Sequence, residues 1–80
     1  MPKKPPHPAA PIAFRLANAP HVELGPLLKI VGVCESGGEA KHLVQSGAVR
    51  VDGQVETRRG KKLLAGARVE ARGRVVLVVP

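Results

Sequence analysis

One stretch decides how this chain folds: ESGGEAKHLVQSGAVRVDG, residues 35–53. The Ser36 hydroxyl can accept a hydrogen bond from the Glu39 amide, and the Glu39 carboxylate can reach back to the Ser36 N–H, which together make the capping box that begins many helices. Apolar residues then recur three and four positions apart, up to Val44. Gly47 follows where a helix needs a left-handed residue to stop. The stretch therefore predicts a short amphipathic helix between Ser36 and Gly47.

A β-hairpin is predicted directly after this helix. Val49 and Val51 alternate with Arg50, which is the pattern of a strand with one buried face. Asp52-Gly53 is a favoured pair for a tight type I′ turn, and residues 54–57 supply the returning strand. The side chains expected outside are basic or hydrogen-bonding on both elements: Lys41, His42, Gln45 and Arg50. A helix followed by a ribbon, both presenting such residues, predicts a nucleic-acid-binding surface.

The composition favours a small aliphatic core and a polyanionic partner. Eighty residues allow one small domain, 44% of them are hydrophobic, and Phe14 is the single aromatic residue. Stacking of unpaired bases on aromatic side chains is therefore disfavoured, which favours structured RNA over single strands. Thirteen Lys and Arg against six Asp and Glu give a formal charge of +7, and such an excess suits phosphates because their neutralisation releases counterions. From Lys41 onward nine residues are basic and three acidic, so most of the excess lies in the C-terminal half.

Several other classes of protein are disfavoured by what the sequence lacks. Cys34 is the single cysteine, so no internal disulfide can form, and no Cys and His residues have metal-ligand spacing. The sequence thus predicts neither a metal nor another cofactor. No apolar run approaches the roughly 18–20 residues of a membrane span, and Met1–Pro11 lacks the apolar middle of a signal peptide. A cytoplasmic location without membrane contact is expected.

The chain is expected to divide into a tail, residues 1–11, and one domain, residues 12–80. The tail holds five prolines and two lysines, which prevent a helix and offer little to bury. It is predicted to be disordered, either without a role or giving weak electrostatic help in RNA binding. Its His7 is not expected to be a ligand.

The rest of the domain is predicted from its hydrophobic pattern. Residues 12–16 alternate as a short strand, and residues 21–33 carry a broad apolar face that suits a helix ended by Gly32. Residues 68–71 and 74–79, joined by a turn, predict a closing antiparallel pair of strands whose valines and leucines complete the core.

A dense run of positive charge follows the hairpin: Arg58, Arg59, Lys61 and Lys62. Such a run is usually a solvated loop, but its place beside the hairpin and the Lys41 helix favours phosphate contact. Lys29 is a further candidate for RNA contact, although its long stem could simply cover core surface.

The sequence resembles the S4-like RNA-binding domain, and over the predicted domain it resembles the small stand-alone S4-like proteins of bacteria. The resemblance rests on one ordered series of residues: Leu24, Leu27, Leu28, Gly32, Ser36, Glu39-Ala40-Lys41, Leu43-Val44, Gly47, Val49, Val51-Asp52-Gly53 and Gly66. It implies an α+β fold in which an αα-hairpin, the αL motif, packs on a small antiparallel β-sheet. It also implies a non-catalytic, ribosome-associated module that holds structured RNA, such as ribosomal or transfer RNA, with its helices and hairpin.

Three positions bear on how far the resemblance transfers the RNA site. Lys41 matches a position where the family usually has Arg, which makes it the first candidate for phosphate contact. Gly37 stands where many members carry Arg, and Glu23 replaces an Arg common at the start of the first helix. Because both departures remove positive charge, the run from Arg58 to Lys62 is expected to compensate.

Two other functions compete with RNA binding. The same basic face could dock an acidic protein partner in a ribonucleoprotein assembly, which is the main alternative. Catalysis by Cys34, near a predicted helix start, is disfavoured because no base and orienting group accompany it. His21 and His42 are expected at the surface or in packing. A sulfur carrier is disfavoured because Val78-Val79-Pro80 offers no terminal Gly-Gly.

Overall fold

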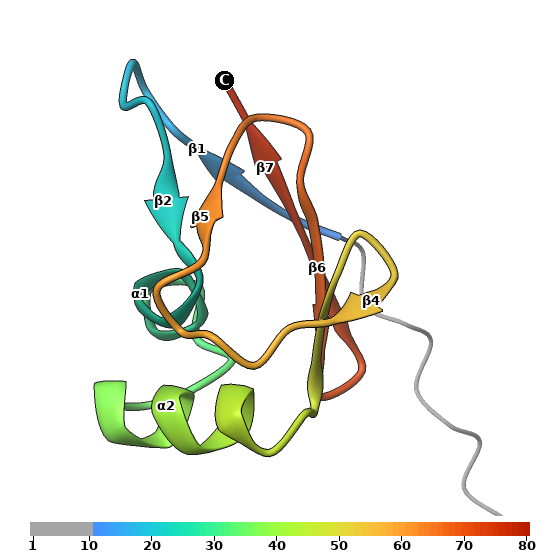
Figure 1. The fold of residues 1–80 in the computed structure, drawn as a ribbon. Helices are drawn as coiled ribbons and strands as arrows, with labels where there is room; N and C mark the ends of the chain where they lie inside the picture. Colours follow the sequence, from blue (N-terminus) through green and yellow to red (C-terminus); the bar gives the residue numbers. More distant parts are fainter. Residues whose placement is uncertain (1–10) are drawn as a thin grey trace, which may run out of the picture.

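The computed structural model describes residues 11–80, so the tail predicted for residues 1–11 lies outside the described residues except for the exposed Pro11. Figure 1 shows two helices packed on one side of a twisted sheet, with a short two-stranded ribbon beside them. The elements are, in chain order, β1 (Ile12–Arg15), β2 (Val22–Glu23), α1 (Leu24–Ile30), α2 (Gly37–Gln45), β3 (Val49–Val51), β4 (Gln54–Val55), β5 (Lys62–Leu63), β6 (Arg68–Ala71) and β7 (Arg74–Val79). The predicted α+β class, an αα-hairpin on a small sheet, is confirmed.

The large sheet has the strand order β1-β7-β6-β3-β4, and β2 pairs with β5 in a separate ribbon. The predicted hairpin and the predicted closing pair form, since β3 pairs antiparallel with β4 and β6 antiparallel with β7. The first strand differs from expectation, because β1 lies parallel to β7 with Phe14 opposite Val78. The sheet is thus mixed and not wholly antiparallel. Alternation in a sequence indicates a strand but carries no information on its direction or on a partner at the other end of the chain.

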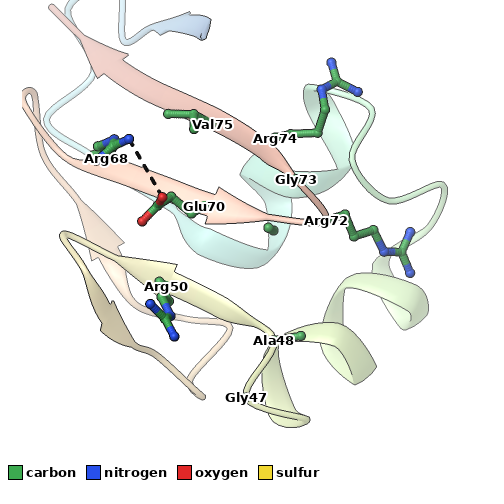
Figure 2. Close-up of a pocket in the computed structure, with 10 residues that line it drawn as sticks. Gly47, Ala48, Arg50, Arg68, Glu70, Arg72, Gly73, Arg74 and Val75 are labelled. Atoms are coloured by element: carbon green, nitrogen blue, oxygen red, sulfur yellow. Dashed lines mark ion pairs between the residues drawn. The ribbon is translucent and has the colours of Figure 1, made fainter. Parts of the chain in front are cut away.

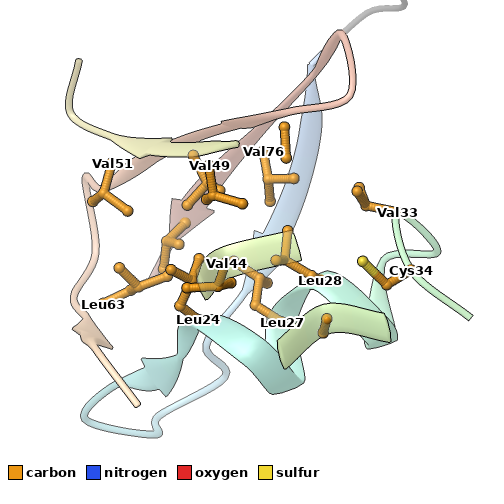
Figure 3. Close-up of a cluster of buried hydrophobic side chains, with 14 of the residues drawn as sticks. Leu24, Leu27, Leu28, Val33, Cys34, Val44, Val49, Val51, Leu63 and Val76 are labelled. Atoms are coloured by element: carbon orange, nitrogen blue, oxygen red, sulfur yellow. The ribbon is translucent and has the colours of Figure 1, made fainter. Parts of the chain in front are cut away.

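The core lies between the helices and the covered face of the large sheet (Figure 3). Strands β3, β6 and β7 each turn alternate residues inward, so their buried side chains meet those of α1 and α2. The largest fully buried side chains are aliphatic apart from one thiol: Leu24, Leu27, Leu28, Leu63, Val44, Val49, Val69, Val76, Val78 and Cys34. Phe14 packs partly buried against this cluster, so the one aromatic ring serves the core.

Helix α2 begins and ends where the sequence predicts. The Ser36 hydroxyl accepts the Glu39 amide proton at 3.1 Å, and Gly47 follows the helix with φ +83°, the left-handed region. One contact of the capping box is wrong: the Glu39 carboxylate accepts from the backbone N–H of Glu35, not from that of Ser36. The carboxylate still serves an amide just before the helix, so the cap works with a shift of one residue.

Helix α1 is shorter than the predicted range 21–33. Its first expected turn is strand instead, because Val22–Glu23 pairs with Lys62–Leu63 to form the β2–β5 ribbon. Pro26 falls in the first turn of α1, where a missing N–H costs little. Gly32 follows the helix with φ +83°, which confirms the predicted stop.

Candidate nucleic-acid interface

The basic loop between β4 and β5 is fixed by the helix that it caps. The first N–H groups of a helix have no partner within the helix. In α1, the Leu24 N–H donates to the Lys61 carbonyl oxygen at 3.0 Å, and the Gly25 N–H donates to the Arg59 carbonyl oxygen at 2.8 Å. Gly25 is buried, and a Cβ there would lie 3.2 Å from the Arg59 Cβ, so the glycine allows the loop to approach closely. Backbone atoms of the loop therefore hold α1, and the Arg59 side chain remains exposed.

A carboxylate organises the other end of the loop. The Glu56 N–H donates to the Val49 carbonyl oxygen at 2.9 Å, which ties the loop to the start of β3. The Glu56 carboxylate accepts from the Arg58 backbone N–H at 3.2 Å and from Arg58 Nε at 3.1 Å. The Arg58 guanidinium therefore lowers the pKa of Glu56, chiefly through the side-chain hydrogen bond. The side chain of Glu56 is 14% exposed and that of Arg58 74%, so the carboxylate is largely buried while the guanidinium paired with it remains accessible to solvent.

The polar residues of α2 are exposed, as is most of the basic loop. Lys41, His42 and Gln45 are exposed, whereas Ala40 and Val44 are buried against α1 and the sheet. The chain passes from α2 straight into β3, where Val49 anchors the loop, and the loop then crosses to the first turn of α1 (Figure 1). We call the predicted residues on these two elements the helix–loop surface: Lys41, His42, Gln45, Arg58, Arg59, Lys61 and Lys62.

Two predicted residues lie away from the helix–loop surface. Lys29 is exposed in the last turn of α1, at the opposite end of that helix from the capping loop. Its charge there suits the negative end of the helix dipole. Arg50 projects from the sheet face that the helices leave open, opposite Val55 on β4 and Glu70 on β6. Figure 2 shows Arg50 on the same face as Arg68 and Glu70, with which it lines one depression.

Arg68, which shares that open face, is not among the residues predicted from the sequence. Arg68 alternates with the buried Val69 as Arg50 does with Val49 and Val51, so the alternation alone could have indicated an outward arginine. Its nearness to Arg50 depends on the pairing of β3 with β6, which local pattern does not reveal.

Most of the predicted cations keep their charge available for a partner. Within residues 11–80, the ion pairs are those of Arg58 with Glu56, Arg68 with Glu70, and Arg72 with Glu39. Six of the predicted basic residues take no part in them: Lys29, Lys41, Arg50, Arg59, Lys61 and Lys62. The positive potential of the surface is therefore largely uncompensated by internal carboxylates.

The residues weighed for catalysis are poorly placed for it. Cys34 is a buried free thiol between the two helices, and burial raises its pKa, which disfavours the nucleophilic thiolate. His21 is half-buried, and His42 is exposed on the outer side of α2. Over residues 11–80 no group of His, Cys, Asp and Glu is arranged to hold a metal ion, and none of the helices there is long and apolar enough to cross a membrane.

Comparison with known proteins identifies the family. Residues 14–79 match the model of the S4 domain. The chain is 50% identical over 66 residues to a candidate RNA-binding protein, YbcJ of Escherichia coli (strain K12), covering 82% of this chain and 94% of YbcJ. It is 40% identical over 52 residues to RlbA of Bacillus subtilis (strain 168), named as a probable ribosome maturation protein, covering 65% of this chain and 73% of RlbA.

A solved structure supports the same assignment. The solution structure of YbcJ from E. coli, described as revealing an αL motif involved in RNA binding, matches with a TM-score of 0.68 and 44% identity. The match covers 100% of this chain and 98% of that one. The resemblance found in the sequence is thus confirmed, and the αα-hairpin of α1 and α2 is the αL motif. The chain belongs to the S4 domain family.

Proposed function

We propose that this protein is a non-catalytic RNA-binding module that holds structured RNA on the helix–loop surface. One observation carries the proposal: the loop from Arg58 to Lys62 caps α1 with its own carbonyl groups. A cationic loop would otherwise lose conformational entropy when RNA orders it. Here backbone hydrogen bonds already hold the loop against α1, so Arg59, Lys61 and Lys62 can contact a partner with less of this cost.

The proposed mechanism combines charge with shape. Lys41 and the four basic residues of the loop contact phosphates, which gives affinity without reading sequence. His42 and Gln45 lie near Lys41 on α2 and can hydrogen-bond to sugar hydroxyls or base edges. Since Phe14 packs against the core, no aromatic ring is offered to an unpaired base. The surface therefore favours folded or double-stranded RNA over single strands.

The relatives suggest where such an RNA belongs. YbcJ is named for RNA binding and RlbA for ribosome maturation, so we infer ribosomal RNA, in a ribosome or a ribosomal precursor, as the partner to test first. Transfer RNA is the second. With such a partner we expect the protein to act in the cytoplasm, and the buried thiol of Cys34 gives no support to a catalytic role.

An NMR titration of the labelled full chain tests the proposal. The probes are ribosomal RNA hairpins, a transfer RNA and a duplex DNA of matched length, each at two salt concentrations. We expect shifts concentrated at residues 41–45 and 58–62, stronger with RNA than with DNA. Shifts scattered over every basic residue, equal for DNA and abolished by moderate salt, would contradict the proposal and favour an acidic protein as the partner of this surface.

A further inference from the structure

The face of the large sheet that the helices leave open carries a second charged surface (Figure 2). Side chains on a sheet alternate between its faces, so each residue whose neighbours are buried points out on this side. We call the following set the open sheet face: Arg50, Arg68, Glu70, Val55, Val75 and Leu77. The residues of the helix–loop surface do not belong to the open sheet face, because they lie on α2 and on the loop that caps α1.

Strand pairing sets basic and apolar side chains next to one another on the open sheet face. Across the strands, Arg50 lies opposite Val55 on one side and Glu70 on the other. Glu70 in turn lies opposite Val75, and Arg68 lies opposite Leu77. Directly opposed side chains are in contact range across neighbouring strands. The open sheet face therefore carries arginines on β3 and β6 and aliphatic side chains along β7.

The charge of this face is positive, and its internal neutralisation is weak. Arg68 Nη2 lies 3.8 Å from Glu70 Oε2, with the two side chains 55% and 38% exposed, so the pair is long and solvated. Arg50 forms no ion pair with any residue in the range 11–80. The β6–β7 turn, from Arg72 to Arg74, lines the same depression. A negatively charged partner is thus favoured.

The apolar part of the face distinguishes a protein from a nucleic acid. Val55 is 55% exposed, and Val75 and Leu77 are half-buried on the sheet face opposite the one that α1 and α2 cover. A phosphate backbone laid across these residues would lose water without gaining a hydrogen bond. An extended peptide that alternates acidic and apolar residues meets both features, because its carboxylates reach the arginines and its apolar side chains lie on β7.

We propose that the open sheet face docks an acidic, partly apolar segment of a protein partner. The carboxylates of that segment pair with Arg50 and Arg68, and its apolar side chains cover Val75 and Leu77. Since this face and the helix–loop surface lie on different elements, the chain can hold RNA and a protein together. The proposal does not depend on RNA binding and can fail while RNA binding stands.

A peptide titration of the full labelled chain tests the docking site. The probe is a capped ten-residue peptide of alternating Glu and Leu, compared with two relatives that carry Lys for Glu or Ser for Leu. We expect shifts at Arg50, Arg68, Val75 and Leu77 with the first peptide, and none there with the other two. Absence of these shifts at millimolar Glu–Leu peptide, or equal shifts with the Lys peptide, would overturn the proposal.

Charge variants sharpen the test without touching the helix–loop surface. Arg68→Gln should lower the affinity for the Glu–Leu peptide about threefold, and Glu70→Gln should raise it about threefold, as expected for partly exposed charge pairs. Glu23→Gln makes the same change of net charge on β2, outside the large sheet, and is the control that should leave peptide affinity unchanged. The face is not a protein-docking site if Glu23→Gln raises the affinity for the peptide as much as Glu70→Gln does. The same conclusion follows if Arg68→Gln lowers the affinity for an RNA hairpin and not the affinity for the peptide.

Discussion

The Arg72 guanidinium joins the β6–β7 turn to the first turn of α2, where its Nη2 lies 3.5 Å from Glu39 Oε2. Its Nη1 also donates to the Val33 carbonyl oxygen at 3.0 Å, in the connection between the two helices. Glu39 meanwhile completes the α2 cap by accepting from the Glu35 N–H. One arginine thus fixes the αα-hairpin to the sheet beyond the C-terminal end of α1, whereas the basic loop caps the N-terminal end of that helix.

Removing this arginine should loosen the αα-hairpin. Replacing Arg72 by Gln leaves the Val33 carbonyl without its charged donor, and loss of a partly buried bond of this kind costs about 1–2 kcal/mol. Urea unfolding should show a lower midpoint at an unchanged m-value. Arg68→Gln, which breaks only the exposed pair with Glu70, should change stability by less than about 0.5 kcal/mol. Equal losses in the two variants would contradict the bracing role of Arg72.

The Ser36 cap should contribute measurably to stability. Its hydroxyl accepts the Glu39 amide proton, and replacing such an N-cap residue by Ala typically costs about 1 kcal/mol. The matched control is Ser46→Ala at the other end of α2, where the hydroxyl donates to the Leu43 carbonyl oxygen, an acceptor that water can also satisfy. Thermal or urea unfolding of both variants measures the difference. A loss of stability in Ser46→Ala as large as that in Ser36→Ala would contradict the expectation.

Stability should fall on acidification because two carboxylates are stabilised in their charged form. The Glu35 N–H, helped by Arg72, lowers the pKa of Glu39 from its ordinary 4.5, and the hydrogen bond from Arg58 lowers the pKa of Glu56 from the same value. A group with a lowered folded pKa adds stability that is present above the ordinary value and is lost as pH falls through the folded value.

The double variant Glu39→Gln/Glu56→Gln should therefore lose less stability than the wild type when pH falls from about 5 to 3. Unfolding free energies measured across this range test the expectation. Glu23→Gln, whose side chain forms no ion pair within residues 11–80, should keep the wild-type acid response. An unchanged acid response in the double variant would show that these two carboxylates contribute nothing to it.

The thiol of Cys34 should react slowly in the folded protein. It is 1% exposed, and burial raises its pKa, so at neutral pH it is a protected, protonated thiol. Iodoacetamide labelling should be at least about a hundredfold slower in the native state than in urea, since it requires opening of the structure. A Ser46→Cys variant supplies a more accessible thiol as the control for fast labelling. Rapid native labelling of Cys34 would reopen a catalytic role.

The ends of the helices and the hairpin turn could be predicted from neighbouring residues in the sequence. The Ser36 cap, the stops at Gly32 and Gly47, and the turn at Asp52-Gly53 depend on residues only a few positions apart, and all appear in the structure. The return contact of the Glu39 carboxylate is shifted by one residue, to the Glu35 N–H. Asp52 and Gly53 have φ values of +52° and +85°, as a type I′ turn requires. Backbone chemistry of neighbouring residues decides such features.

The features that the sequence did not predict depend on strand pairing between segments far apart in the chain. Val22–Glu23 fits a helix pattern but becomes strand because Lys62–Leu63 offers a partner, and β1 takes its direction from β7 at the other end of the chain. The candidate site divides in the same way. The charged run from Arg58 to Lys62 was visible as composition, whereas its anchoring to α1 and the separation of Arg50 from it depend on tertiary contacts.

The salt dependence of RNA binding tests the central claim most directly. The variant that replaces Arg58, Arg59, Lys61 and Lys62 by Ala removes four charges and keeps the backbone carbonyl groups that cap α1, so it should fold as the wild type does. Affinity for a ribosomal RNA hairpin should fall, and the slope of log K against log salt should flatten by about 0.7–0.9 for each phosphate that the variant no longer neutralises. The control Arg15→Ala/Arg68→Ala removes charge from β1 and β6 of the large sheet and should leave that slope unchanged. A folded loop variant with wild-type affinity and slope would contradict the helix–loop surface as the RNA site.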